Sequence, residues 1–534
     1  MSSISFSSSP YASLEEWFGF LGLSLLFFIG ANLKINEQKF KHLTWIIIGA
    51  ASVLSFIGLL IYTTGLYNRL TSVFYWPNPF ATFLLLAIPL SYYWIYIDTS
   101  RLKIFSLPIL ILLVTSLILT GSRGALIALG IGSIFILIRD FKVIRQNIFK
   151  IILILLIIFC SVISVNYLRS DHNAFLKRAS SNGELDVSSS IRLDYWYGAI
   201  QIFKDNFLFG SGLDTFKNIY PTYQKSPLSS GIYPHNLYLE ILAEGGVFSF
   251  VVFLSFLFFI LMGSLKNLKN NLIIFALLLS TIFYLAHNAL DIGSHYFAYN
   301  LLFWFLLGVL VNINNKENNS NEMKEDVKNN FNFIIFLLSI ILIIYQLLLL
   351  NHKYYLYTAE QLEEKNNYEE TGANYLKSIR FIKSPEALMG LGKNYFIQSI
   401  YGGDQNKLLS SSLIVADNLI KIDCRSSANY ELRGKVYESL GYFDKAIVDY
   451  KKTIALDRFN PRYYINLVDL LIKNRNYKDA GLYLNIILSS YPKEVVERKK
   501  MLIMESQTMT SGIEYEMDLL YRLEDKLKYY EKNK

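Results

Sequence analysis

Residues 237–262 have the sequence LYLEILAEGGVFSFVVFLSFLFFILM, in which the only charged side chains are Glu240 and Glu244, both near its start. A helix needs about 20 apolar residues to cross the hydrocarbon core of a bilayer. This stretch is longer than that, and its apolar part is continuous. It therefore predicts a membrane-spanning helix that starts with polar residues.

Similar apolar stretches lie on both sides of it along the chain. Of the 534 residues, 53% are hydrophobic, which is above the apolar share of a soluble domain. We predict an all-α fold with a polytopic bundle of about ten transmembrane helices. The other predicted spans are residues 17–33, 43–62, 80–97, 104–120, 124–138, 150–166, 272–290, 298–312 and 331–350.

The net charge of +8 does not indicate nucleic-acid binding, because no basic tract with interleaved aromatic residues is present. The two cysteines, Cys160 and Cys424, have neither the spacing of a metal site nor that of a disulfide framework. We therefore expect a membrane protein that binds no nucleic acid, no metal and no cofactor.

The lysines and arginines of the short loops predict an orientation, because such residues are enriched in cytoplasmic loops. Every second loop is basic, which leaves residues 62–79, the turn at 122–124 and the long segment 167–236 on the outer side. The same alternation puts the linker 312–330 inside and returns the chain to the outer side through 331–350. The basic loops contain Lys34, Lys39 and Lys41; Arg101 and Lys103; Arg139, Lys142, Arg145 and Lys150; and Lys266 and Lys269.

After Asn351 the sequence becomes charged and rich in tyrosine, and a 34-residue period appears in the pairs Tyr430 and Tyr464, Phe443 and Tyr477, and Ala446 and Ala480. This is the tetratricopeptide period. An earlier unit begins at Pro385. We predict an α-solenoid of three or four repeats, because each helix pair buries its apolar face only against a neighbour.

We accordingly divide the chain into a transmembrane domain, residues 1–350, and a repeat domain, residues 351–534, on the outer side of the membrane. Two interpretations of the repeats stay open. They present a concave face that binds a peptide or a partner protein, or they form a spacer or a cap on the membrane side.

Three polar residues lie beside the predicted outer ends of the spans: Arg123, Arg192 and His235. A poorly solvated charge near a bilayer is costly and usually functional. The guanidinium fork of arginine matches the oxygens of a phosphate. An imidazole can take a proton from an attacking hydroxyl at neutral pH. Two anion-binding arginines beside a base are typical of a transferase or a hydrolase.

Several short motifs surround these residues in a fixed order, namely WPNPF at 76–80, LTGSRGA at 119–125, Arg192 with Trp196, FGSGLDTF at 209–216, PHNLYLE at 234–240, AEGG at 243–246, and His287 with Asp291. In this order and spacing the chain resembles the O-antigen ligase and polymerase superfamily. The resemblance covers roughly residues 60–312.

The resemblance implies a glycosyltransferase that needs neither metal nor nucleotide sugar. It would move a glycan from an undecaprenyl-pyrophosphate carrier to a lipid, glycan or protein acceptor at the outer face of the bacterial cytoplasmic membrane. Arg123 and Arg192 would hold the donor pyrophosphate, and His235 would be the base or would orient the acceptor hydroxyl. The supporting residues would be Ser122, Asn236, Glu240, His287 and Asp291.

Several alternatives remain at this stage. The same motifs fit a polymerase of lipid-linked repeat units or a protein O-oligosaccharyltransferase. A membrane scaffold or a lipid-linked glycan transporter is the non-enzymatic alternative, although a transporter typically has charged residues near the midplane of its spans. At single residues, Arg192 has Asp186 and Asp194 as alternative partners, and His287 lies one helical turn from Asp291.

Overall fold

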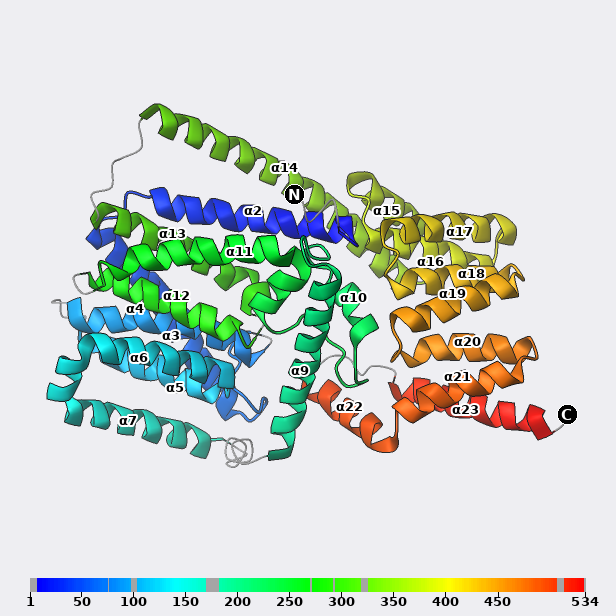
Figure 1. Ribbon diagram of the computed structural model, residues 1–534, viewed down its shortest axis with the longest axis horizontal. Helices are drawn as coiled ribbons and strands as arrows, with labels where there is room; N and C mark the ends of the chain where they lie inside the picture. The colour runs from blue at the N-terminus through cyan, green and yellow to red at the C-terminus, as the bar shows by residue number, and fades with distance from the viewer. Residues whose placement is uncertain are drawn as a thin grey trace.

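The computed structural model describes residues 7–74, 76–97, 103–169, 182–268, 271–291, 293–317, 325–506 and 513–532. Within these ranges every regular element is a helix (Figure 1). The all-α prediction is therefore confirmed. Two of the predicted cytoplasmic cations, Arg101 and Lys269, lie outside the described residues.

Ten apolar helices form the larger body of the molecule, and each coincides with one of the predicted apolar stretches. In the described part of the chain, eight of them are long and apolar enough to cross a membrane, and the apolar helices at Ile104–Leu119 and Leu272–Asn288 are shorter. The ten are α2 (Pro10–Asn32), α3 (Glu37–Thr63), α4 (Pro77–Ile97), α5 (Lys103–Leu119), α6 (Arg123–Gln146), α7 (Ile148–Tyr167), α11 (Leu237–Leu265), α12 (Leu272–Asn288), α13 (Phe297–Glu317) and α14 (Glu325–Glu364).

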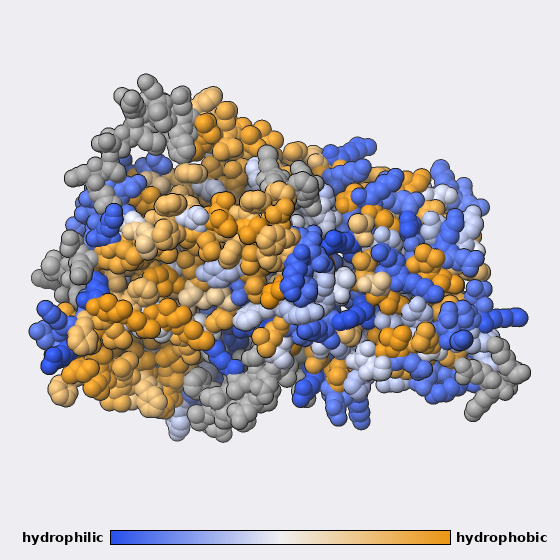
Figure 2. Space-filling model, viewed as in Figure 1, coloured by the Kyte–Doolittle hydropathy of each residue, from blue (hydrophilic) through white to orange (hydrophobic). Residues whose placement is uncertain are grey.

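The core of this bundle lies around α4 and α12. From Ile274 to Asn288 nearly every side chain of α12 is buried, and most of α4 is buried as well. By contrast, α7 and α14 expose most of their apolar side chains, such as Phe159 and Ile343. Hydrophobic residues cover the bundle surface in Figure 2, whereas hydrophilic residues cover much of the repeats. Such a surface suits a bundle surrounded by lipid.

The two ends of the bundle differ in the turns that lie there. The turns between α3 and α4, α5 and α6, and α12 and α13 lie at the end that faces the repeat helices (Figure 1). The connections between α2 and α3 and between α6 and α7 lie at the opposite end (Figure 1). This alternation agrees with the predicted parity of the loops, and the end near the repeats is the one that the cation pattern assigns to the outside.

Two further helices, α9 (Asn182–Asp205) and α10 (Phe216–Tyr223), lie at this end of the bundle, and α9 crosses it (Figure 1). The loop between them is fixed to α11, which is kinked at Gly246. The carboxylate of Glu244 accepts hydrogen bonds from the backbone N–H groups of Asp214 and Phe216, each at 2.8 Å. The start of the chain also contacts this loop, because Ser13 donates to the carbonyl of Leu213 at 2.8 Å.

The repeat helices stack as antiparallel pairs beside this end of the bundle (Figure 1). The unit predicted to begin at Pro385 begins there. The predicted boundary at residue 350 falls inside α14, which continues from its apolar part into the repeats. The helices are α15 (Tyr368–Phe381), α16 (Pro385–Tyr401), α17 (Gln405–Ile422), α18 (Ser427–Ser439), α19 (Phe443–Leu456), α20 (Pro461–Lys473), α21 (Tyr477–Ser490), α22 (Lys493–Ser506) and α23 (Ile513–Lys532).

Candidate active site

Asp291, which follows α12, is the centre of a polar cluster at the repeat-facing end of the bundle. The guanidinium of Arg192 lies 3.2 Å from its Oδ2 atom. Nδ1 of His235 lies 3.8 Å from its Oδ1 atom, which is beyond hydrogen-bond distance. Asn78 donates a hydrogen bond to the same carboxylate. The structure thus brings the predicted residues Arg192 and His235 together on one acidic side chain.

The Asp291 carboxylate is buried, with only 4% of its side chain exposed. Burial by itself raises the pKa of Asp291, but His235, His287 and Arg192 together hold that pKa below its ordinary value. The group is therefore ionised at neutral pH. A fixed negative charge at this position holds the Arg192 guanidinium in place and faces Nδ1 of His235.

Asn78 connects this carboxylate to an arginine that the sequence interpretation missed. Arg69 donates to Oδ1 of Asn78 at 2.7 Å and to the carbonyl of Thr120 at 2.7 Å. It therefore ties the turn before α6 to the start of α4 and, through Asn78, to Asp291. In the sequence, Arg69 is a single arginine in a loop predicted to be outside, close to the WPNPF motif. That position was the sequence signal for its role.

His287 is fully buried and sits between two hydroxyl groups. Nδ1 lies 2.9 Å from Oγ1 of Thr82, and Nε2 lies 3.3 Å from Oγ of Ser122. Both ring nitrogens are thus occupied. The predicted supporting residues Ser122 and His287 do contact each other, and together they fix the turn that precedes Arg123.

Arg123 is the first residue of α6. Its side chain is exposed, and among the described residues it has no hydrogen-bond or ion-pair partner. The residues on either side of it meet His287: Ser122 through its hydroxyl, and Gly124 through a close approach, because a Cβ there would lie 3.3 Å from Cδ2 of that ring. A free guanidinium at a helix N-terminus is well placed to bind an anion.

His235 has a left-handed backbone, with a φ of +53°. Such a conformation is uncommon for a residue other than glycine and clusters at functional sites. The imidazole stacks on the ring of Tyr195, with centroids 5.6 Å apart and planes 13° apart. Asn236, predicted as a supporting residue, is the N-cap of α11 and accepts hydrogen bonds from the N–H groups of Tyr238 and Leu239, both at 3.0 Å.

Glu240, the remaining predicted residue, pairs with a histidine that the sequence interpretation also missed. Nε2 of His295 lies 2.6 Å from Oε1 of Glu240, and the ring of Tyr233 stacks on His295 at 3.7 Å. Burial lowers the pKa of His295, but Glu240 and Glu16 outweigh that effect and raise it above the ordinary value. Next to the His235 loop there is therefore a second, closed pair of histidine and carboxylate.

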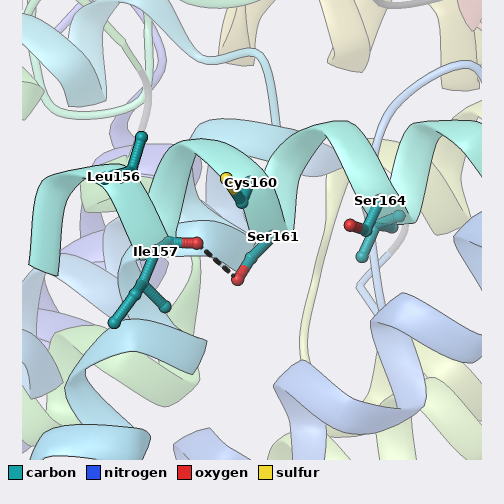
Figure 3. Close-up of a pocket in the computed structure, with 6 residues that line it drawn as sticks. Leu156, Ile157, Cys160, Ser161 and Ser164 are labelled. Carbon is teal, nitrogen blue, oxygen red and sulfur yellow. Dashed lines mark hydrogen bonds between the residues drawn. The ribbon is translucent and has the colours of Figure 1, made fainter. Parts of the chain in front are cut away.

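A shallow hollow on the bundle surface does not belong to this cluster. Figure 3 shows Leu156, Ile157, Cys160, Ser161 and Ser164 around it, all on α7. Ser161 donates to the carbonyl of Ile157 at 2.8 Å, within the same helix. The hollow is mostly apolar and offers no cation, so it does not suit a phosphate.

Residues 108–254 match the O-antigen ligase family. This segment of O-antigen ligase type contains Ser122, Arg123, Arg192, His235, Asn236 and Glu240. His287, Asp291 and His295 follow it along the chain and complete the cluster in space. The resemblance predicted from the motifs is confirmed over this segment.

The chain is similar to a thermophilic tetratricopeptide-repeat protein of Thermus thermophilus, known from a crystal structure, with 17% identity, coverage of 39% of this chain and 93% of that chain, and a TM-score of 0.25. No curated protein matches the chain. The repeat architecture described here follows from the helical pairs themselves.

Proposed function

We propose that the chain transfers a glycan from an undecaprenyl-pyrophosphate carrier to an acceptor at the outer face of the bacterial cytoplasmic membrane. The O-antigen ligase match supports glycan transfer of the ligase or polymerase kind. The observation that most supports a catalytic role for this cluster is the buried Asp291 carboxylate beside both Arg192 and His235. That arrangement puts a base next to an anion-binding group.

The proposed reaction is a single displacement. The acceptor hydroxyl gives its proton to Nε2 of His235, because Nδ1 faces Asp291. The oxygen attacks the anomeric carbon of the donor glycan, and the bond from that carbon to the pyrophosphate oxygen breaks. Arg123 and Arg192 stabilise the charge of the leaving pyrophosphate. Attack opposite the leaving group inverts the anomeric configuration.

Asp291, His287 and Ser122 are positioning residues in this scheme. Asp291 stabilises the imidazolium that forms on His235, and it keeps the Arg192 fork oriented. His287 holds Ser122 and thereby the start of α6, where Arg123 lies. A guanidinium held in advance reorganises little when the leaving group develops its charge.

We further propose that transfer needs no metal, because the two arginines supply the positive charge at the pyrophosphate. The acceptor is a lipid, a glycan or a protein, so a polymerase and a protein O-oligosaccharyltransferase remain alternatives with the same donor chemistry. In each case residues 1–350 form the transferase domain and residues 351–534 form an outward-facing repeat domain.

The direct test of the base compares the wild type with His235→Ala. Both proteins are purified, placed in lipid vesicles and given undecaprenyl-pyrophosphate glycan with an acceptor, with and without a chelator. We expect the variant to lose about 10²–10⁴-fold in rate, which is the usual contribution of a general base, and we expect the wild type to keep its rate in chelator.

The matched control is His42→Ala, which removes an exposed histidine near the start of α3. It should transfer at the wild-type rate. Full activity of His235→Ala at normal membrane levels would contradict the role of His235, and a wild-type rate that is lost in chelator and restored by a divalent cation would contradict the metal-independent mechanism.

A further inference from the structure

The repeat helices hold α10 through three hydrogen bonds. Nδ2 of Asn218 donates to Oδ2 of Asp423 at 3.0 Å, and Oγ1 of Thr222 donates to the carbonyl of Leu456 at 3.3 Å. The guanidinium of Arg458 donates to the carbonyl of Gln224. Two positions of α10 that lie one helical turn apart, and the residue after the helix, are therefore bonded to the repeats.

The repeat residues in these contacts occupy equivalent places. Asp423 is the C-cap of α17, and Leu456 is the last residue of α19. Arg458 follows two residues later, where the repeat pattern would otherwise have a proline. The ends of the second helices of two successive repeats thus form one edge against which α10 lies. Asp423 and Gln224 are buried where α10 meets this edge, whereas Arg458 and Thr222 are exposed.

The other face of α10 packs on α9. Tyr220 is buried, and its ring meets the ring of Tyr195 edge to face, with centroids 5.3 Å apart. The two helices approach closely at Gly198, where a Cβ would lie only 2.4 Å from the Tyr220 ring. Any side chain at that position would displace Tyr220, so the glycine is needed for this contact.

Tyr195 is also the residue on which His235 stacks. The contacts therefore run without a break from the repeat edge through α10 and Tyr220 to Tyr195 and then to His235. Tyr195 comes three residues after Arg192 on the same helix. A shift of α10 would reach both the proposed base and one arginine of the proposed pyrophosphate site.

We propose that the edge formed by Asp423, Leu456 and Arg458 is the docking site for α10 of the same chain, and that this contact positions His235 for transfer. The positioning role rests on the proposed function. This edge of the repeats is then a fixed part of the transferase site. A partner protein would have to bind another face.

The experiment combines hydrogen exchange with kinetics on the full-length protein in lipid vesicles. The variant is the double substitution Asn218→Ala with Arg458→Ala, which removes two of the bonds at the repeat edge. We expect faster amide exchange in residues 216–224 and also in residues 234–240. We expect kcat to fall on the order of 10²-fold, the effect of a small misplacement of a catalytic group, with little change in KM for the donor.

Three further variants separate positioning from general damage. The single variant Arg458→Lys keeps a hydrogen-bond donor and an intact Asn218, so it should have most of the wild-type kcat. Arg522→Ala removes an exposed arginine of α23 and should change neither the amide exchange nor kcat. Tyr220→Leu removes the ring through which α10 contacts Tyr195. Its effect on kcat should be non-additive with that of Arg458→Ala, because both act through one path.

Faster exchange at 216–224 with unchanged exchange at 234–240 and unchanged kcat would overturn the positioning role. Unchanged exchange at 216–224 would overturn the docking contact itself. A wild type that transfers no glycan would refute the proposed function instead. Exchange at 234–240 would still decide whether the repeats fix the His235 loop.

Discussion

Arg123 and Arg192 have different surroundings, although the same role is proposed for both. Arg192 is held by Asp291 and is about one-third exposed, with 29% of its side chain accessible. Arg123 is exposed and has no partner among the residues that the structure describes. We infer that Arg192 is oriented before the donor arrives, and that Arg123 becomes ordered when it binds the pyrophosphate.

Replacing either arginine with lysine keeps the charge but removes the planar fork of donors. We expect Arg123→Lys and Arg192→Lys each to lose about 10²-fold or more in transfer rate, because an oriented donor at a developing charge contributes that much. Initial rates with purified donor check this. Arg145→Lys, an exposed arginine at the other end of α6, is the control, and wild-type rates in both test variants would contradict the proposed anion site.

The pair of His295 and Glu240 predicts a pH dependence of stability. The pKa of His295 is raised in the folded protein. The pair therefore makes its full contribution to stability below the unfolded pKa of about 6.5. The contribution is lost as the pH rises through the higher folded pKa. His295→Gln should therefore destabilise the protein by about 1–3 kcal/mol at about pH 6 and by much less at high pH.

Thermal unfolding of the wild type and His295→Gln across this pH range measures the difference. His42→Gln supplies the matched control, since His42 is exposed. A difference that grows with increasing pH would contradict a charged His295 paired with Glu240.

Local motifs in the sequence point to individual residues of the cluster, but not to the pairs that these residues form. Arg192, His235 and Asp291 could be identified from their motifs, but the pairing of Arg192 with Asp291 could not, because Asp194 lies nearer in sequence. Arg69 and His295 escaped notice because each acts through partners far along the chain. Their roles depend on how α4, α6 and α11 pack, which no local pattern encodes.

At the scale of the element, the start of α11 determines where His235 lies. Asn236 caps this helix through two backbone N–H groups, and the preceding residue has the left-handed backbone. The cap therefore fixes both the first turn of α11 and the direction of the His235 side chain. If His235 is the base, as proposed, the cap also positions that base.

Asn236→Ala removes the cap and should cost about 1 kcal/mol of stability. The transfer rate should fall by more than this loss of stability explains, because His235 is displaced. Asn271→Ala removes the corresponding cap of α12 and is the control. The transfer rates of the two variants are compared at equal concentrations of folded protein. Equal rates would show that the α11 cap has no effect on His235.

The helices themselves were predictable because long apolar stretches leave the backbone few alternatives in lipid. The ends of the helices were less predictable. The predicted domain boundary falls inside α14 because the sequence around Asn351 contains neither proline nor glycine, and the helix continues from the apolar part into the repeats. The contact between α10 and the repeats could not be predicted, since it depends on polar residues with no periodicity.

For the whole molecule, the main expectation is that the cluster and the repeats share the outer side. Cys424 is exposed in the repeats, and Cys160 lies in the apolar helix α7. In a Cys160→Ser background, a membrane-impermeant maleimide should label Cys424 in cells whose cytoplasmic membrane is intact. Labelling only after the membrane is permeabilised would place the repeats inside and reverse the predicted orientation.

One product analysis decides whether the protein carries out the proposed reaction. The purified protein in lipid vesicles is given undecaprenyl-pyrophosphate glycan and an acceptor, and the lipid product and the glycosylated acceptor are both quantified. We expect free undecaprenyl pyrophosphate and glycosylated acceptor in equal amounts, with inverted anomeric configuration. An intact donor, or a lipid product other than undecaprenyl pyrophosphate, would contradict the proposed reaction.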